Sequence, residues 1–136
     1  MENINQAIAL LNLHMSAAVD LQEQANAAKF YTKLPLFDEI AGEAEQWQGV
    51  FVQRVIDLLD LGVPDQEMPK VVGSESSYLD PYPRGLSGAE AHRQAVRNAL
   101  STFVVKTREA IALSSTHTAD VFTEVSLAAD QALRNM

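Results

Sequence analysis

Between Pro35 and Gly62 the sequence carries one unbroken apolar repeat, and this repeat constrains the fold more than any other feature. Its members, three or four residues apart, are Phe37, Ile40, Ala44, Trp47, Phe51, Val55 and Leu58. This spacing places all of them on one face of an α-helix. Proline suits the first helical turn because its missing N–H needs no partner there, and Asp38 follows where the helix dipole favours negative charge. Gly62 and Pro64 predict the end of the helix.

A second apolar stripe predicts a helix before this one. It is expected to begin near Asn3 or Asn5, either of which can cap a helix, and to run to about Ala28. Its members are Ile4, Ile8, Leu11, Met15, Ala18, Gln22 and Ala25. The amide of Gln22 interrupts the stripe, and a polar group in such a place needs a hydrogen-bonding partner. We therefore expect a buried amide that is hydrogen-bonded to a neighbouring side chain or to the backbone.

The second half of the chain predicts two further helices after a long connection. Residues 63–86 are rich in Pro, Ser, Gly and Asp, and this segment is too long for a tight hairpin between antiparallel neighbours. Ser87-x-x-Glu90 has the form of a capping box and predicts a third helix that runs to about Leu113. A fourth helix is expected to start at Thr116 or Thr118. The fold class is therefore all-α, a four-helix bundle with a long crossover between helices two and three.

Composition limits the classes of protein to which the chain can belong. Its 136 residues suit one domain, spanning 1–136, and 47% hydrophobic residues suit a folded core. The absence of cysteine excludes disulfides and thiolate metal sites. A net charge of −8 argues against DNA binding, which depends on lysine and arginine. With no long apolar run and no signal-peptide pattern, the expectation is a cytoplasmic protein that does not enter a membrane.

Several short motifs, in order along the chain, resemble those of the Dps family, the twelve-subunit mini-ferritins of the ferritin-like superfamily. They are the frame Phe30, Leu34 and Phe37-Asp38-Glu39, the stop Gly62-Val63-Pro64, the pair Tyr82-Pro83, Arg108-Glu109-Ala110-Ile111 and Thr118 to Ser126. The resemblance implies a ferritin-like bundle, assembly into a homo-oligomer, either a dodecamer or a dimer, and a part in iron storage or stress protection. Iron is the cofactor that the family would bring.

The resemblance also implies where iron would bind. Family members oxidise iron at a site shared by two subunits, and its five ligand positions correspond here to Gln22, Leu34, Asp38, Gly49 and Gln53. Among these, Asp38 alone keeps a ligand of the expected type. Leucine and glycine have no donor atom to offer, and glutamine offers a neutral oxygen, so affinity for iron should fall steeply. We interpret Leu34 and Gly49 as places where packing has replaced the ligands.

Three hypotheses follow from these substitutions. The first is a Dps-like cage subunit whose iron-oxidising centre is largely lost, which makes enzymatic activity doubtful. The second is an active mini-ferritin with a relocated site around Asp38, Glu39 and Glu23. The third is a subunit of a mixed shell, or an interaction partner, alongside an active relative. Lys106, at a position that resembles a family pore aspartate, would repel Fe(II).

The remaining side chains that could bind a metal form no ligand pattern on a single helix. They are His14, Asp20, Glu43, Glu45, His92 and His117. We expect a core or capping role for His92 and a solvated position for His117. No metal site other than the remnant at Asp38 is predicted.

Overall fold

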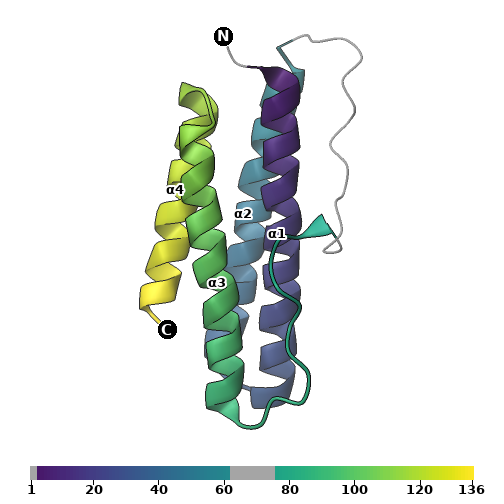
Figure 1. The fold of residues 1–136 in the computed structure, drawn as a ribbon, viewed down its shortest axis with the longest axis vertical. Coiled ribbons are helices and arrows are strands. Elements are labelled where there is room, and N and C mark those ends of the chain that lie inside the picture. Colours follow the sequence, from purple (N-terminus) through teal and green to yellow (C-terminus); the bar gives the residue numbers. More distant parts are fainter. Residues whose placement is uncertain (1–2, 62–75) are drawn as a thin grey trace.

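The structure is a computed structural model that describes residues 3–61 and 76–136. This part of the chain forms four α-helices and no strand. They are α1 (Ile4–Thr32), α2 (Pro35–Leu59), α3 (Ala89–Ala112) and α4 (Thr116–Arg134). The helices lie side by side and form a bundle, as predicted (Figure 1).

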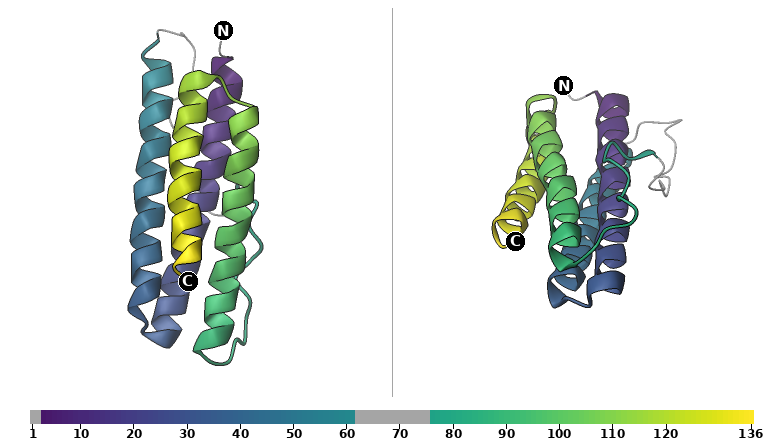
Figure 2. Two further views of the ribbon diagram at one scale, coloured as in Figure 1. Left: turned by 90° about the vertical axis from the view of Figure 1, so that its left-hand side faces the viewer. Right: turned by 60° about the horizontal axis from the view of Figure 1, so that its bottom comes forward.

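Each helix packs against neighbours that run in the opposite direction. α1 packs mainly on α2, α3 packs mainly on α4, and further contacts join α1 to α3 and α2 to α4. Tyr31 at the end of α1 stacks on His92 at the start of α3, and Arg54 near the end of α2 donates to Thr118 at the start of α4. α2 and α3 therefore run in the same direction on one diagonal of the bundle (Figure 2).

The start of α1 agrees with the prediction, whereas its end differs. Asn3 caps the helix, as predicted, with its side-chain oxygen 3.1 Å from the amide nitrogen of Gln6. The helix continues past Ala28 to Thr32 and ends where Lys33 adopts a left-handed conformation, with a φ of 60°. Glycine usually marks such an end. A lysine in that role gives no comparable signal in the sequence.

The predicted starts of the other helices are confirmed for α2 and α4 and wrong for α3. Pro35 occupies the first turn of α2, and α4 begins at Thr116. The capping box at Ser87 does not form, because Gly88 is the residue that precedes α3 and no side chain caps it. Gly88 has a φ of 85°, which glycine adopts readily, and this turn leaves Ser87 outside the cap position.

The connection between α2 and α3 is described in part. The predicted end of α2 at Gly62 and much of the predicted crossover fall on residues 62–75, which lie outside the described residues. Residues 76–88 pass along α1 to the start of α3 (Figure 1). The Gln24 side chain donates to the Asp80 carbonyl at 3.0 Å and fixes this passage.

The apolar faces meet in the centre of the bundle. All seven members of the α2 repeat are buried, which confirms the periodicity: Phe37, Ile40, Ala44, Trp47, Phe51, Val55 and Leu58. Trp47 stacks on Phe103 of α3 with ring centroids 5.5 Å apart. Burial of one large apolar side chain contributes about 1.5–3 kcal/mol, so this face holds α2 in place.

Candidate functional site

The five predicted iron positions lie on the surface of the bundle formed by α1 and α2. Gln22 is half-buried on α1, Gly49 and Gln53 are exposed on α2, and Leu34 precedes α2 with 38% of its surface exposed. Asp38 lies in the first turn of α2, as predicted, with 62% of its side chain exposed. In a single chain these residues form an open surface.

Asp38 is paired with a cation. The Nζ of Lys29 lies 2.7 Å from Oδ1 of Asp38, and the two residues face each other across the turn between α1 and α2. The sequence does not point to Lys29, because the first helix is expected to end at about Ala28. Lysine near the end of one helix and aspartate in the first turn of its antiparallel neighbour would have been a usable signal. The carboxylate that is the remnant of the predicted ligand set therefore already has a positively charged partner.

The two glutamines at predicted ligand positions are both hydrogen-bonded within the chain. The Gln48 amide donates to Oε1 of Gln22 at 2.8 Å, which confirms that Gln22 is held by a neighbour, although it is half-buried and not fully buried. Gln53 donates to Asp57 at 3.0 Å on the exposed face of α2. Each amide thus serves a local contact.

Within one chain, Leu34 and Gly49 are not enclosed by other residues, contrary to our interpretation that packing has replaced the ligands there. A Cβ atom placed on Gly49 would have no atom within 4 Å, and Leu34 is 38% exposed. Any packing at these two positions would have to come from another molecule.

The other predicted donors do not assemble into a metal site in the described part of the chain. No group of three or more His, Asp or Glu side chains there could hold a metal ion. Glu23, Asp38 and Glu39 are thus not brought together within one chain. His117 is exposed and His92 is buried, both as predicted.

His14 is a buried polar residue among aromatic rings. It is 2% exposed, and its ring lies 5.0 Å from the ring of Phe122 and 6.3 Å from that of Phe51. Its Nδ1 shares a hydrogen bond of 2.8 Å with the hydroxyl of Tyr78. Burial, and then the charge of Lys106, lowers the pKa of His14 from 6.5 to about 4. The imidazole is therefore neutral near pH 7.

The partner of His14, Tyr78, is half-buried. Burial, and then the nearby Glu109, raises the pKa of Tyr78, so its hydroxyl stays protonated. A cavity of about 190 Å³ beside the pair is lined by Leu10, Leu13, His14, Tyr78, Lys106, Glu109, Ala110 and Leu113. The pairing was not predictable from sequence alone, because 64 residues separate His14 from Tyr78.

Lys106 lies at the edge of this region. Its Nζ is 6.0 Å from the centre of the Tyr78 ring and 3.8 Å from a carboxylate oxygen of Glu109. The resemblance to the Dps family placed Lys106 at a pore. In this chain its ammonium lies near the face of the Tyr78 ring and near the Glu109 carboxylate.

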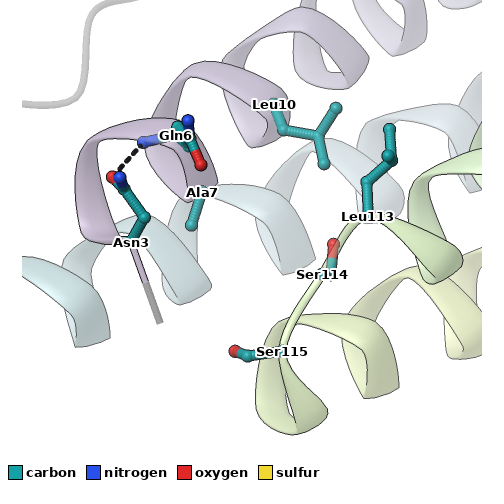
Figure 3. A pocket seen from close by; sticks show the side chains of 7 residues that line it. All are labelled: Asn3, Gln6, Ala7, Leu10, Leu113, Ser114 and Ser115. Carbon is teal, nitrogen blue, oxygen red and sulfur yellow. Dashed lines mark hydrogen bonds between the residues drawn. The ribbon is translucent and has the colours of Figure 1, made fainter. Parts of the chain in front are cut away.

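A further cavity of about 610 Å³ lies at the N-terminal end of α1 (Figure 3). Asn3, Gln6 and Leu10 face the α3–α4 connection there, at Leu113 and Ser114. The Asn3 side chain is engaged in capping α1. The described residues that line the cavity include no titratable side chain, so they offer no acid, base or charged ligand.

Comparison of the sequence with models of known protein families and with curated proteins finds no match. Within the described residues no helix is long and apolar enough to cross a membrane.

Proposed function

We propose that this chain is a subunit of a Dps-like, ferritin-type assembly whose shared iron-oxidising centre has been lost. The observation that carries the proposal is the order and direction of the four helices. Under this proposal the bundle serves a structural, storage or protective role in the cytoplasm.

The helix directions support a ferritin-type bundle. α2 and α3 run the same way along one diagonal, while every packed pair of neighbours is antiparallel. This arrangement fits a connection between α2 and α3 that runs along the length of the bundle, which is the crossover proposed here. Ferritin-like folds use one such crossover, whereas simple up-and-down bundles use none.

The contacts around Asp38 support the loss of the iron centre. Fe(II) binding there would require displacement of the Lys29 ammonium, 2.7 Å from the carboxylate. The amides of Gln22 and Gln53 would add no negative charge and are already hydrogen-bonded. Hard divalent cations favour charged oxygen ligands, so these residues make a poor site.

Charge argues against a DNA-binding assembly. The chain has 18 acidic and 10 basic residues, and its net charge of −8 would repel the phosphate backbone. The proposal therefore excludes DNA as a partner. Copies of this chain, in a dodecamer or a dimer, are the partners that the resemblance to the Dps family implies.

Two measurements test the proposal. Light scattering coupled to size-exclusion chromatography should give a closed oligomer, and a monomer at micromolar concentration would refute the assembly. Aerobic Fe(II) oxidation should proceed at the buffer rate for the native chain and for Asp38→Ala.

A matched variant sharpens the iron assay. Lys29→Ala frees the Asp38 carboxylate while leaving the other positions unchanged, and we expect it to restore no oxidation, since one carboxylate is too few. Oxidation well above the buffer rate in the native protein that disappears in Asp38→Ala would show that the centre is retained and would contradict the proposal.

A further inference from the structure

A cavity of about 530 Å³ lies where the connection into α3 passes the end of α1. The side chains that matter here are Tyr31 from α1, Tyr82 and Arg84 from the connection, and His92 from α3. Pro83 and Leu86 add apolar surface to the same wall. Its volume is within the range of about 300–1,000 Å³ that is usual for small-molecule sites.

Three rings form a stacked series along this cavity. The rings of Tyr31 and His92 are 5.2 Å apart with planes inclined by 19°, and those of His92 and Tyr82 are 5.8 Å apart at 26°. His92 is 5% exposed, and its Nδ1 shares a hydrogen bond with the Tyr82 hydroxyl. The central ring is thus fixed in place, and the outer ring of Tyr31 stacks on a rigid base.

Tyr31 remains accessible although it is stacked. It is 68% exposed, which is unusual for a large aromatic side chain in a folded protein. The Phe30 ring stands nearly perpendicular to it, with centroids 5.2 Å apart, and Nζ of Lys33 lies 4.9 Å from the centre of the Phe30 ring. The Tyr31 ring has one stacked neighbour, His92, and is otherwise largely open to solvent, which suits it to stack against a flat ligand.

Arg84 supplies the charge. Its side chain is exposed, and it makes no ion pair with any described residue. Other described arginines, Arg93, Arg108 and Arg134, lie next to carboxylates. A free guanidinium at the edge of a cavity binds phosphate or carboxylate through two parallel hydrogen bonds.

We propose that this cavity binds a planar aromatic anion of the nucleoside monophosphate class. The base stacks on Tyr31 at the open end of the ring series, and the phosphate pairs with Arg84. The apolar surface of Pro83 and Leu86 covers the sugar. Because the chain as a whole is acidic, an anion that binds here must be recognised by this local arrangement and not by general charge.

Isothermal titration calorimetry of the full chain tests the proposal with three probes. Adenosine 5′-monophosphate carries both the ring and the anion, adenosine lacks the anion, and ribose 5-phosphate lacks the ring. We expect the monophosphate to bind in the millimolar range or tighter and the two partial probes to bind at least tenfold more weakly, since each forfeits one of the two contacts.

Variants separate the two contacts. Tyr31→Ala and Arg84→Gln should each weaken binding of the monophosphate roughly tenfold or more, and Tyr31→Phe, which keeps the ring, should bind like the native chain. Arg108→Gln removes a charge on another side of α3 and is the matched control. Circular dichroism verifies that each variant keeps its helices, which the exposure of both residues favours.

Four results would overturn the proposal. They are no binding of the monophosphate by the native chain at millimolar concentration, equal binding by Tyr31→Ala, equal binding by Arg84→Gln, and equal affinity for ribose 5-phosphate. The last would mean that the aromatic series has no part in recognition.

Discussion

His14 inside the bundle and Asp38 on its surface are each held by one close polar contact, yet the two contacts differ in what they do. The His14–Tyr78 pair is 2.8 Å apart among aromatic rings, and burial lowers the pKa of the histidine to about 4. The Asp38–Lys29 pair is 2.7 Å apart, with side chains 62% and 46% exposed. Similar distances therefore accompany different energetics, because desolvation differs.

The two residues differ in whether they contribute to stability or to contact with a partner. A neutral, hydrogen-bonded histidine that is 2% exposed can hold the core together but offers little surface to a ligand. An exposed carboxylate adds little to stability but remains available to a partner. Substitutions in the two regions should therefore have effects of different size, and the predictions below go from the largest to the smallest.

Loss of an aromatic ring beside His14 should have the largest effect. Phe51 is fully buried and lies 5.6 Å from the ring of Phe122. Phe51→Ala should reduce the free energy of unfolding by about 3–5 kcal/mol, because it removes apolar burial and leaves a cavity. Urea unfolding measures the change. Gln53→Ala, half a turn further on the exposed face, should change it by less than about 0.5 kcal/mol. An equal loss of unfolding free energy in the two variants would contradict the expected difference between the core and the surface.

Acidification should destabilise the protein through His14. In the unfolded chain this histidine takes up a proton near pH 6.5, whereas in the folded chain it does so near pH 4. The unfolded state therefore binds more protons between these values, and stability should fall as the pH is lowered through this window, by about 3 kcal/mol in total.

The control for this pH effect uses two histidine variants. His14→Leu should remove most of the pH dependence between pH 6.5 and 4, whatever its effect on stability at neutral pH. His117→Gln changes an exposed residue and should leave the dependence unchanged. A His14→Leu protein that still loses the same stability on acidification would show that other groups are responsible.

The periodic parts of the fold could be predicted from sequence, because one face of a helix must be apolar. All seven expected members of α2 are buried, and Pro35 and Thr116 begin their helices. The predictions were wrong at two helix ends, where the backbone conformation of a single residue determines the boundary. Lys33 ends α1 with a φ of 60°, and Gly88 with a φ of 85° displaces the expected cap at Ser87.

The environment of the polar residues could be predicted far less well. Gln22 was correctly expected to find a partner, but its partner Gln48 is 26 residues away and lies on another helix. Lys29 was not expected beside Asp38, although both ends of the α1–α2 turn were visible in the sequence. Contacts of this kind depend on how two helices are rotated against each other, which apolar spacing does not specify for each polar side chain.

Removal of the Tyr78 hydroxyl should have an intermediate effect. Tyr78→Phe keeps the ring but leaves Nδ1 of His14 without its partner at 2.8 Å. An unsatisfied polar group in a buried place costs about 1–3 kcal/mol, so the free energy of unfolding should fall by that amount. Tyr31→Phe removes a hydroxyl from a residue that is 68% exposed and should have almost no effect. If Tyr78→Phe left the free energy of unfolding unchanged, burial of His14 would not depend on this hydrogen bond.

The smallest effect is expected at the Lys29–Asp38 pair. A double-mutant cycle with Lys29→Ala and Asp38→Asn should give a coupling energy of about 0.2–1 kcal/mol, and 1 M salt should reduce it, since both side chains are largely exposed. Repeating the cycle at several protein concentrations tests whether this surface is part of an oligomer interface. If a second subunit covers this surface, the pair is desolvated, and its coupling should be larger at concentrations that favour the oligomer. A coupling that is small and independent of protein concentration would place the pair in solvent and would mean that no second subunit covers this surface.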